Sequence, residues 1–418
     1  MIESIKKRAY EIENELGKEI EEVCNFIFNN PELGEEEYIS SKYLVEKMKE
    51  YGFDTVYPYC NMETAFRAEL GDNDGPTIAF LAEYDALPGY GENKEPAHAC
   101  GHNWIAASTL GACIVLSKLK ENFKGKIVLI GTPAEETTGG KCDLVKAGAF
   151  DDVDVSYQMH IEAFNNINCK ALAIDSLEFS FEGVSAHAAS HPHMGVNALD
   201  AVQLTFAGIN ALRQHVKSDV RIHGIVSNGG EAPNIVPEKA ACKFFVRAAE
   251  RSYLDEVTKK VINCAKGAEL MTGAKLSYRY LENSFDNIIN NKVLQKITKN
   301  NLIEAGITDI LEGKDGPVGS TDIGNVSQVC PTMYTEIALD ISPMVYVHEK
   351  EFLNYANSEE AYDKLHKAVK AMVGCALEIY LEDDYLMRLR KPLKLKINWY
   401  YLKKVIPFLF CLLIKIVL

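Results

Sequence analysis

The order in which strand-like and helix-like segments follow one another constrains this chain more than any other feature of its sequence. From Gly75 to His160, apolar β-rich runs alternate with helical segments: "GPTIAFLAEYDALPG", "NWIAASTLGACIVLSKLKEN", "GKIVLIGTPAEE" and "DVDVSYQMH". From Ser176 the order becomes strand, helix, strand, strand, helix, strand, which is typical of a split βαβ, ferredoxin-like unit. After Phe285 the alternation resumes. The sequence therefore predicts an α/β fold, a sheet with helices on both faces, into which a small α+β domain is inserted.

The predicted domain boundaries follow from these changes of pattern. A discontinuous α/β domain, an inserted domain and a tail are expected at residues 1–175 with 286–384, at 176–285 and at 385–418. From Arg388 to Leu418 there are eight Lys and Arg and no acidic residue, unlike the rest of the chain. The apolar end, "VIPFLFCLLIKIVL", is shorter than the roughly 20 residues that span a bilayer. The sequence does not indicate the role of this tail. Any membrane contact of the protein would be made through it alone.

Length, charge and cysteine usage exclude several classes of protein. At 418 residues the chain is too long for one ordinary core and is expected to hold about two domains. A net charge of −15, without a basic segment in the main body, excludes nucleic acid as a partner. Eleven cysteines, mostly in apolar stretches, indicate free thiols in a reducing compartment. The N-terminus is charged throughout and lacks a signal-peptide core, so we expect a cytoplasmic protein.

Polar side chains gather where the predicted strands end, which is where open α/β sheets bind their ligands. The first, second and third strands end on Glu83 and Asp85, on Glu135 and Glu136, and on His160. Each of these residues alone has a structural explanation, as a solvated turn or as a polar strand end. Together, thiolate, imidazole and carboxylate donors at adjacent strand ends favour a divalent metal site, because the structural alternative buries several ionisable groups without gain.

The segment "HACGHN", residues 98–103, follows the first strand and opens a helix. Three interpretations of it are open on the residues alone: a metal site that uses Cys100 and a histidine, a thiol nucleophile with a histidine base, and a tight polar turn. The neighbouring Glu135 and Glu136 can serve a metal site in different ways. Successive side chains of a strand point to opposite sides, so one carboxylate can bind metal while the other accepts a proton from water.

Six motifs resemble one known family: "EYDALPG", "HACGHN", "GTPAEE", "YQMH", "GVSAHAAS" and "GSTDIGNVSQVCP". They resemble the di-metal amidohydrolases of the aminoacylase and carboxypeptidase metallopeptidase family, in the branch of hippurate hydrolase, the auxin-conjugate hydrolases and p-aminobenzoyl-glutamate hydrolase. The likeness runs from about residue 10 to 380. It implies a mixed-sheet catalytic domain with a ferredoxin-like lid, through which two subunits form a homodimer.

The resemblance also implies roles for the residues at the strand ends. Two divalent ions, zinc or manganese with cobalt or nickel as alternatives, would be held by five side chains: Cys100, His102, Glu136, His160 and His348. Glu135 would be the general base, and Asp85 would orient a metal ligand. By this resemblance Cys100 is a ligand rather than a nucleophile, because a thiol hydrolase has no use for the carboxylates and for His160.

In the inserted domain, the resemblance implies that His187, Asn234 and Arg247 contact the substrate or its oxyanion. Each of these side chains has a structural alternative, as a helix cap or as part of a surface salt bridge. One residue departs from the branch, since Asn103 follows "CGH" where an aspartate is usual. We expect this exchange to remove a charge next to the metals.

The function implied is hydrolysis of a C–N amide bond in an N-acyl amino acid, an aminobenzoyl-glutamate-like conjugate or a dipeptide. The substrate would be a small amide, attacked by water that the metals activate. Two alternatives are hydrolysis of an N-carbamoyl amide and a catalytically silent protein that keeps the fold to bind a ligand.

Overall fold

The computed structural model describes the chain except for residues 1, 314–318, 383–384, 386–387 and 390–418. The C-terminal tail expected at 385–418 therefore lies outside the described residues, apart from residues 385, 388 and 389. Across the part of the chain that the structure describes, no helix is both long and apolar enough to cross a membrane.

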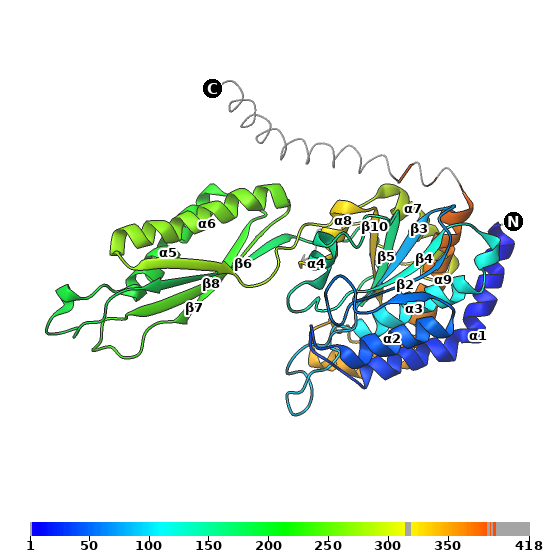
Figure 1. Cartoon of the computed structure of the whole chain (residues 1–418), viewed down its shortest axis with the longest axis horizontal. Helices are drawn as coiled ribbons and strands as arrows, with labels where there is room; N and C mark the ends of the chain where they lie inside the picture. The colour runs from blue at the N-terminus through cyan, green and yellow to red at the C-terminus, as the bar shows by residue number, and fades with distance from the viewer. Residues whose placement is uncertain (1, 314–318, 383–384, 386–387, 390–418) are drawn as a thin grey trace, which may run out of the picture. The chain divides into compact units, whose positions relative to one another are not determined.

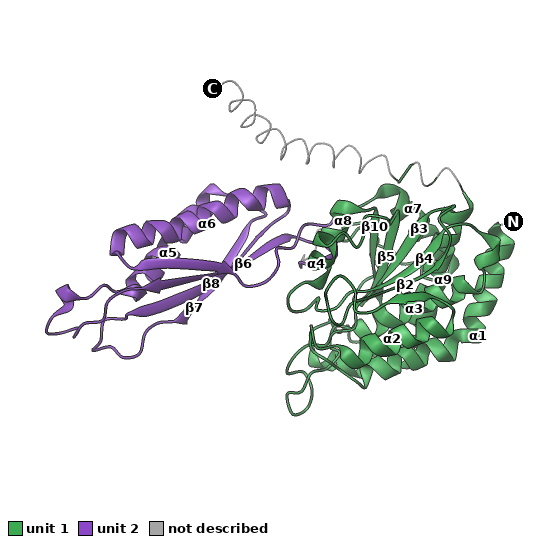
Figure 2. Ribbon diagram, in the orientation of Figure 1, with its two compact units in different colours: residues 1–169, 289–316, 325–418 green, residues 170–288, 317–324 purple. Residues whose placement is uncertain are grey.

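The chain forms two compact units (Figure 2). Unit 1 contains residues 1–169, 289–316 and 325–418, and unit 2 contains residues 170–288 and 317–324. Unit 2 is thus built mainly from one continuous stretch, to which a short segment from far downstream is added.

Unit 1 is built on a six-stranded mixed sheet. Its order is β1 (Asp54–Val56), β2 (Phe66–Gly71), β4 (Lys126–Gly131), β3 (Thr77–Ala82), β5 (Val155–Glu162) and β10 (Thr332–Ala338). The contiguous strands β4, β3, β5 and β10 are parallel, whereas β2 runs antiparallel to both of its neighbours. The central strands are buried along most of their length, as expected when helices cover a parallel sheet. The predicted mixed α/β fold is confirmed.

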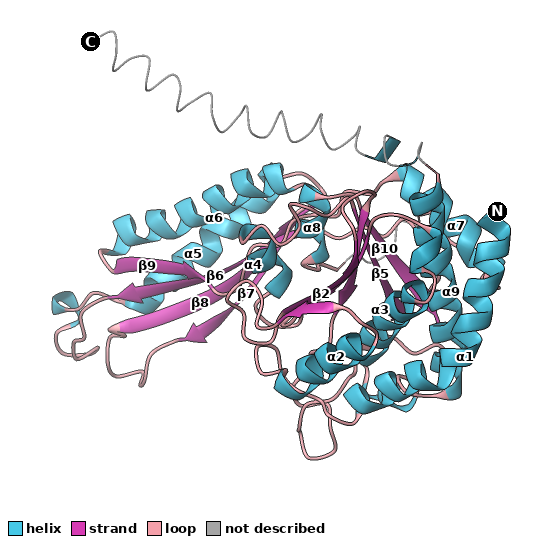
Figure 3. Ribbon diagram, turned by 45° about the vertical axis from the view of Figure 1, so that its right-hand side comes forward, coloured by secondary structure: helices cyan, strands magenta, loops and turns pink. Residues whose placement is uncertain are grey.

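Helices pack around this sheet (Figures 1 and 3). They are α1 (Ile2–Phe28), α2 (Tyr38–Glu50), α3 (His102–Ser117), α4 (Gly140–Lys146), α7 (Lys292–Glu304) and α9 (Glu359–Leu381), with 3-10 turns η1 (Lys120–Asn122) and η4 (Lys350–Asn354). Helix α8 (Ile323–Val329) begins in the short downstream segment of unit 2 and continues into unit 1. Helix α3 packs against β3, β4 and β5 on one side and against α1 and α9 on another. It is buried from its first residue to Leu116, in keeping with a sequence that carries apolar residues on all sides of the helix.

Unit 2 is a four-stranded antiparallel sheet with two long helices. It contains β6 (Ala173–Glu182), β7 (Arg221–Asn228), β8 (Lys239–Ala248), β9 (Lys275–Tyr280), α5 (Ala198–Leu212), α6 (Arg251–Thr272), η2 (Pro192–Met194) and η3 (Arg213–His215). The strand order β7-β8-β6-β9 is that of a split βαβ unit. Side chains of β8 alternate between buried and half-buried, since one face of the sheet packs on the helices.

Candidate metal centre at the ends of the parallel strands

The register of the parallel strands brings polar side chains from three strands to one edge of the sheet. Ala82 of β3 pairs with Gly131 of β4, so Glu83 and the segment that leads to Glu135 leave the sheet at the same edge. Phe80 of β3 pairs with Tyr157 of β5, which places Glu83 level with His160. Parallel strands end at a common edge, and this is where α/β sheets bind ligands.

A first group of possible metal ligands contains Cys100, His102 and His160, whose ligand atoms all lie within 4.8 Å of one another. All three side chains are buried. Cys100 Sγ lies 3.5 Å from Nε2 of His160, and the His102 and His160 rings meet edge to face with centroids 5.8 Å apart. Thiolate and imidazole are the ligands that zinc and related divalent ions prefer.

A second group shares Cys100 with the first and adds Glu136 and His348. Nε2 of His348 lies 3.3 Å from Cys100 Sγ and 3.2 Å from Oε1 of Glu136. His348 comes from the segment after β10, almost 250 residues from Cys100, and its backbone N–H donates to the carbonyl of Ala99. Glu135 joins His102 and Glu136 in a further group. The five residues suggested as ligands are therefore brought together, and Cys100 lies where the two groups meet.

Asp85 contacts two members of this cluster, His102 and Glu136. Its Oδ1 lies 2.8 Å from Nδ1 of His102, and its Oδ2 accepts a hydrogen bond of 2.9 Å from the backbone N–H of Glu136. Among the described residues, no group makes a hydrogen bond to the buried Nε2 of His102. A buried ring nitrogen that makes no hydrogen bond is costly, and a cation between it and the carboxylates of Glu83 and Glu136, 3.4 and 3.8 Å away, would satisfy all of them, so the residues fit a metal ion.

The burial and the charges of the cluster shift the pKa values of Cys100 and His160. Burial, together with the carboxylates of Glu136 and Glu135, raises the pKa of the Cys100 thiol well above its usual value. Burial and the nearby His102 lower the pKa of His160 to about 4. A cysteine nucleophile needs a lowered pKa, so these surroundings argue against the thiol-hydrolase interpretation. A bound cation would instead lower the pKa of Cys100 and favour its thiolate.

Lys141, a residue that sequence reasoning missed, lies beside the cluster and pairs with Glu83. Lys141, fully buried at the start of α4, donates a hydrogen bond of 2.5 Å to Oε1 of Glu83. The other oxygen, Oε2, lies 3.4 Å from Nε2 of His102. Burial alone would raise the pKa of Glu83, but the positive charges of Lys141 and His102 lower it to about 2. The signal available in the sequence was the lysine of "GGK", five residues after Glu136.

Three residues with left-handed backbone shape the loops of the site. Gly101 precedes α3 with φ +80°, and a Cβ there would lie 2.3 Å from a side-chain carbon of Ile161. Only glycine fits that position, which places His102 at the first turn of the helix. Ala134 (φ 61°) and His348 (φ 65°) adopt the same conformation without being glycine. Such conformations are costly and concentrate at functional sites.

Asn103 does not face the cluster as expected. Its side-chain amide donates to Sγ of Cys24 on α1 at 3.1 Å and to the carbonyl of Ala356 at 3.0 Å. The residue is fully buried between α3 and these neighbours. The amide therefore links α3 to α1 and to the turn that precedes α9, because successive residues of a helix point about 100° apart and His102 already faces the cluster.

The three residues suggested for substrate contact lie in unit 2. His187 and Asn234 are exposed and belong to adjacent loops: the backbone of His187 pairs with that of Ile235, and Ala188 N–H donates to the carbonyl of Asn234. Arg247, half-buried on β8, donates a hydrogen bond of 2.9 Å to Oγ of Ser320.

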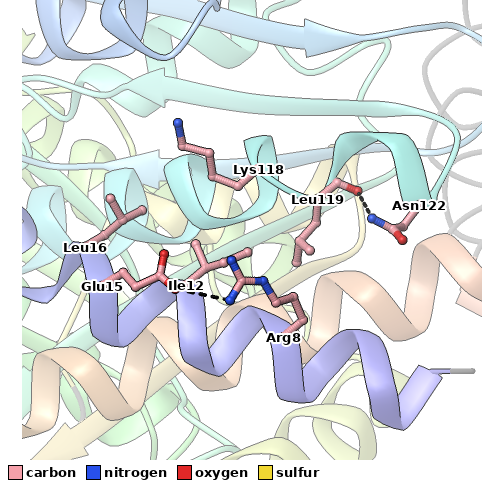
Figure 4. Close-up of a pocket in the computed structure, with 7 residues that line it drawn as sticks. All are labelled: Arg8, Ile12, Glu15, Leu16, Lys118, Leu119 and Asn122. Atoms are coloured by element: carbon pink, nitrogen blue, oxygen red, sulfur yellow. Dashed lines mark hydrogen bonds and ion pairs between the residues drawn. The ribbon is translucent and has the colours of Figure 1, made fainter.

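A separate pocket lies between α1 and the C-terminal end of α3 (Figure 4). It has a volume of about 420 Å³ and is lined by Arg8, Ile12, Glu15, Leu16, Lys118, Leu119 and Asn122. Lys118 and His102 lie at opposite ends of α3, about 24 Å apart at 1.5 Å per residue. The pocket is therefore distinct from the donor cluster.

Comparison with known proteins identifies the family of this chain. The family model described as "Peptidase family M20/M25/M40" matches residues 79–377. The chain is 34% identical over 412 residues to a mouse protein named Xaa-Arg dipeptidase, covering 95% of this chain and 94% of that one. It is 34% identical over 274 residues to one of the subunits of p-aminobenzoyl-glutamate hydrolase from Escherichia coli, covering 62% and 57% of the two chains.

Among solved structures, a dinuclear metal-binding peptidase of the same family from Bacillus subtilis superposes with a TM-score of 0.62 at 18% identity. The match covers 85% of this chain and 98% of that one, and it supports the fold. Because the family model spans most of the chain and the dipeptidase relative covers nearly all of it, the protein belongs to peptidase family M20/M25/M40 and is a hydrolase, as the motifs predicted.

Proposed function

We propose that this protein hydrolyses the amide bond of small dipeptides, with a basic residue on the carboxyl side of the bond. The observation that carries the proposal is the pair Glu135 and Glu136 beside the cysteine and histidine ligands, which combines a proton acceptor with metal donors in one place. The name of the mouse relative, which matches over nearly the full length, supports the choice of dipeptide. N-acyl amino acids and aminobenzoyl-glutamate-like conjugates are the next substrates to test.

The proposed cofactor is a pair of divalent ions held by the two groups that meet at Cys100. One group is Cys100, His102 and His160, and the other is Cys100, Glu136 and His348. When bound, the ions supply polarisation of the amide carbonyl and activation of water. The mixed thiolate, imidazole and carboxylate ligands suit zinc, and manganese, cobalt and nickel are the alternatives.

Each acidic residue at the site has a proposed role. Glu135 accepts a proton from the attacking water and returns it to the leaving amine. Its neighbour Glu136 binds metal, with its backbone fixed by Asp85. Asp85 also fixes the orientation of His102 and leaves Nε2 as the ring nitrogen that would bind an ion.

Unit 2 is proposed to serve as a lid and to form a homodimer. Its strand β7 lies at the edge of the sheet, and Ile225 and Val226 on it are exposed, which makes this edge available for pairing. His187 would stabilise the oxyanion in the partner's site, and Asn234 and Arg247 would hold the substrate. We further propose a cytoplasmic location, since every cysteine among the described residues is a free thiol.

A substrate panel tests the proposal. Protein freed of metal with a chelator is reloaded separately with zinc, manganese, cobalt or nickel and assayed on Xaa-Arg and Xaa-Lys dipeptides, N-acetyl amino acids, aminobenzoyl-glutamate and an N-carbamoyl amino acid. We expect the fastest turnover on the basic dipeptides. Faster turnover of the carbamoyl compound would establish the alternative reaction, and binding of the panel without turnover in any metal form would establish a silent relative.

A further inference from the structure

The loop between α1 and α2 packs against the turn that carries Glu135. This loop contains Glu32 to Glu37, in the sequence "ELGEEE", and precedes Tyr38, the first residue of α2. The turn runs from Ala134 to Gly139 and is closed by a hydrogen bond from Gly139 N–H to the Ala134 carbonyl. The two segments are about 100 residues apart in the chain, so their contact is a product of the fold.

Glu37 is the main polar link between them. Its side chain is fully buried, and Oε1 accepts a hydrogen bond of 2.7 Å from the backbone N–H of Ala134. Oε2 accepts a hydrogen bond of 2.8 Å from the hydroxyl of Thr64, and the Thr64 carbonyl in turn accepts one from the hydroxyl of Tyr84. Tyr84 lies between Glu83 and Asp85 in sequence, so the network connects the ends of β3 and β4.

Gly34 provides a second, independent contact. A Cβ at this position would lie 2.2 Å from Oγ1 of Thr137 and 2.9 Å from Cα of Ala134. Backbone atoms cannot move aside as a flexible side chain can. The loop at Gly34 is therefore in close contact with the backbone of the turn at Ala134. The exposed side of the contact carries a further hydrogen bond, from the Thr138 hydroxyl to Glu35.

The backbone at Ala134 requires such support. A non-glycine residue with φ 61° is disfavoured by about 1–2 kcal/mol, and released from its contacts this peptide would relax. Because Ala134 directly precedes Glu135, any relaxation would redirect the Glu135 side chain. A displacement of about 1 Å in a reacting group can reduce the rate by about 100-fold.

We propose that Glu37 is a positioning residue for the reaction: it holds the Ala134 peptide and thereby fixes the direction of Glu135. This inference rests on the proposed role of Glu135 as the base. Glu37 is not a catalytic residue, because its contacts are with the protein and its oxygens are occupied by Ala134 and Thr64.

Kinetics of the full-length, metal-loaded protein test this proposal with Glu37→Ala, Glu37→Gln and Thr64→Val. Glutamine keeps an oxygen for Ala134 N–H and an amide group that can donate to the Thr64 hydroxyl, so Glu37→Gln should keep most of kcat. Glu37→Ala should lower kcat by about 10- to 100-fold with KM and metal content unchanged. Thr64→Val removes one of the two hydrogen bonds to Glu37, so its kcat should lie between those of Glu37→Gln and Glu37→Ala. Glu36→Ala is the matched control, since Glu36 is an exposed neighbour in the same loop.

The outcomes separate a positioning role from a structural one. If Glu37→Ala lowers the melting temperature but leaves kcat unchanged well below that temperature, Glu37 only stabilises the fold and the proposal is wrong. Loss of metal together with kcat would also overturn it, because the loop would then act through the ligand Glu136. If Glu37→Ala does not fold, equal kcat in Thr64→Val and wild type overturns the proposal. Glu135→Gln is assayed in parallel: full activity there refutes the base itself, whereas an inactive Glu135→Gln with a fully active Glu37→Ala refutes only the positioning role.

Discussion

Asp85 and His102 are joined by a contact of 2.8 Å between Oδ1 and Nδ1, and both side chains are almost completely buried. The second oxygen of Asp85 accepts the backbone N–H of Glu136. One carboxylate from the end of β3 thus orients a proposed ligand at the start of α3 and another after β4. It also fixes which ring nitrogen of His102 is available to an ion.

Replacing Asp85 by asparagine should weaken metal binding. Asparagine keeps one oxygen, so it cannot serve both His102 and the Glu136 N–H, and the loss of such a partner typically reduces metal affinity by about 10- to 100-fold. Competition with a chromophoric chelator measures this affinity. Asp143→Asn, which changes a surface carboxylate on α4, is the control and should bind metal as wild type does. Unchanged affinity in Asp85→Asn would show that the contact does not support the ligand.

The adjacent glutamates should behave differently when each is replaced by glutamine. Glu135→Gln should keep its metal while turnover collapses, because the amide cannot accept the proton of water. Glu136→Gln should lose metal as well as turnover, because a carboxylate ligand is removed. Elemental analysis of the two purified variants gives the metal content. Equal metal retention in both would contradict the roles assigned here.

How far the sequence predicts this structure depends on the range of the interactions involved. The apolar runs that end on Asp85 and Glu136 marked buried strands, and parallel strands necessarily bring such ends to one edge. The partner of Glu83 could not be inferred, because the pair with Lys141 depends on where α4 begins. The direction of Asn103 depended on the packing of α3 against α1 and α9, which no local pattern records.

The buried pair of Lys141 and Glu83 should be sensitive to the loss of one partner only. In chelator-treated protein, Lys141→Met leaves the buried Glu83 carboxylate without its hydrogen-bonded cation and with only the longer contact to His102, which should destabilise the fold by about 3–5 kcal/mol in urea unfolding. Adding Glu83→Gln should recover much of the loss. Lys146→Met on the same helix removes an exposed pair with Asp143 and should change stability by less than about 1 kcal/mol. A double variant no more stable than Lys141→Met would show that packing, rather than charge, sets the effect.

His366 should make the stability of unit 1 depend on pH. Its Nδ1 lies 2.6 Å from Glu13 and its Nε2 lies 2.9 Å from Glu21, so both ring nitrogens face carboxylates, while Lys370 contacts the other oxygen of Glu13. The hydrogen bond to Glu13 outweighs burial and raises the pKa of His366 above 6.5.

Because the folded-state pKa is the higher one, this stabilisation is complete below about pH 6.5 and is lost as pH rises through the folded-state pKa. The difference in unfolding free energy between wild type and His366→Gln, measured by urea titration at several pH values, should therefore shrink as pH rises across this range. A difference that is independent of pH would show that the histidine contributes by packing alone.

Complementation between two inactive variants tests whether His187 acts across the dimer. His187 lies in an exposed loop of unit 2, whereas Glu135 lies at the edge of the unit 1 sheet. Homodimers of Glu135→Ala and of His187→Ala should each be nearly inactive. In a mixed dimer, one site combines an intact Glu135 with the partner subunit's His187, and the other site lacks both. Random pairing makes about half of the dimers mixed, each with one intact site of two, so activity should recover to about a quarter of wild type.

Native mass spectrometry confirms that mixed dimers have formed. Mixed dimers without activity would mean that His187 serves its own subunit or takes no part in catalysis, and a monomeric protein would remove the dimer from the proposal altogether.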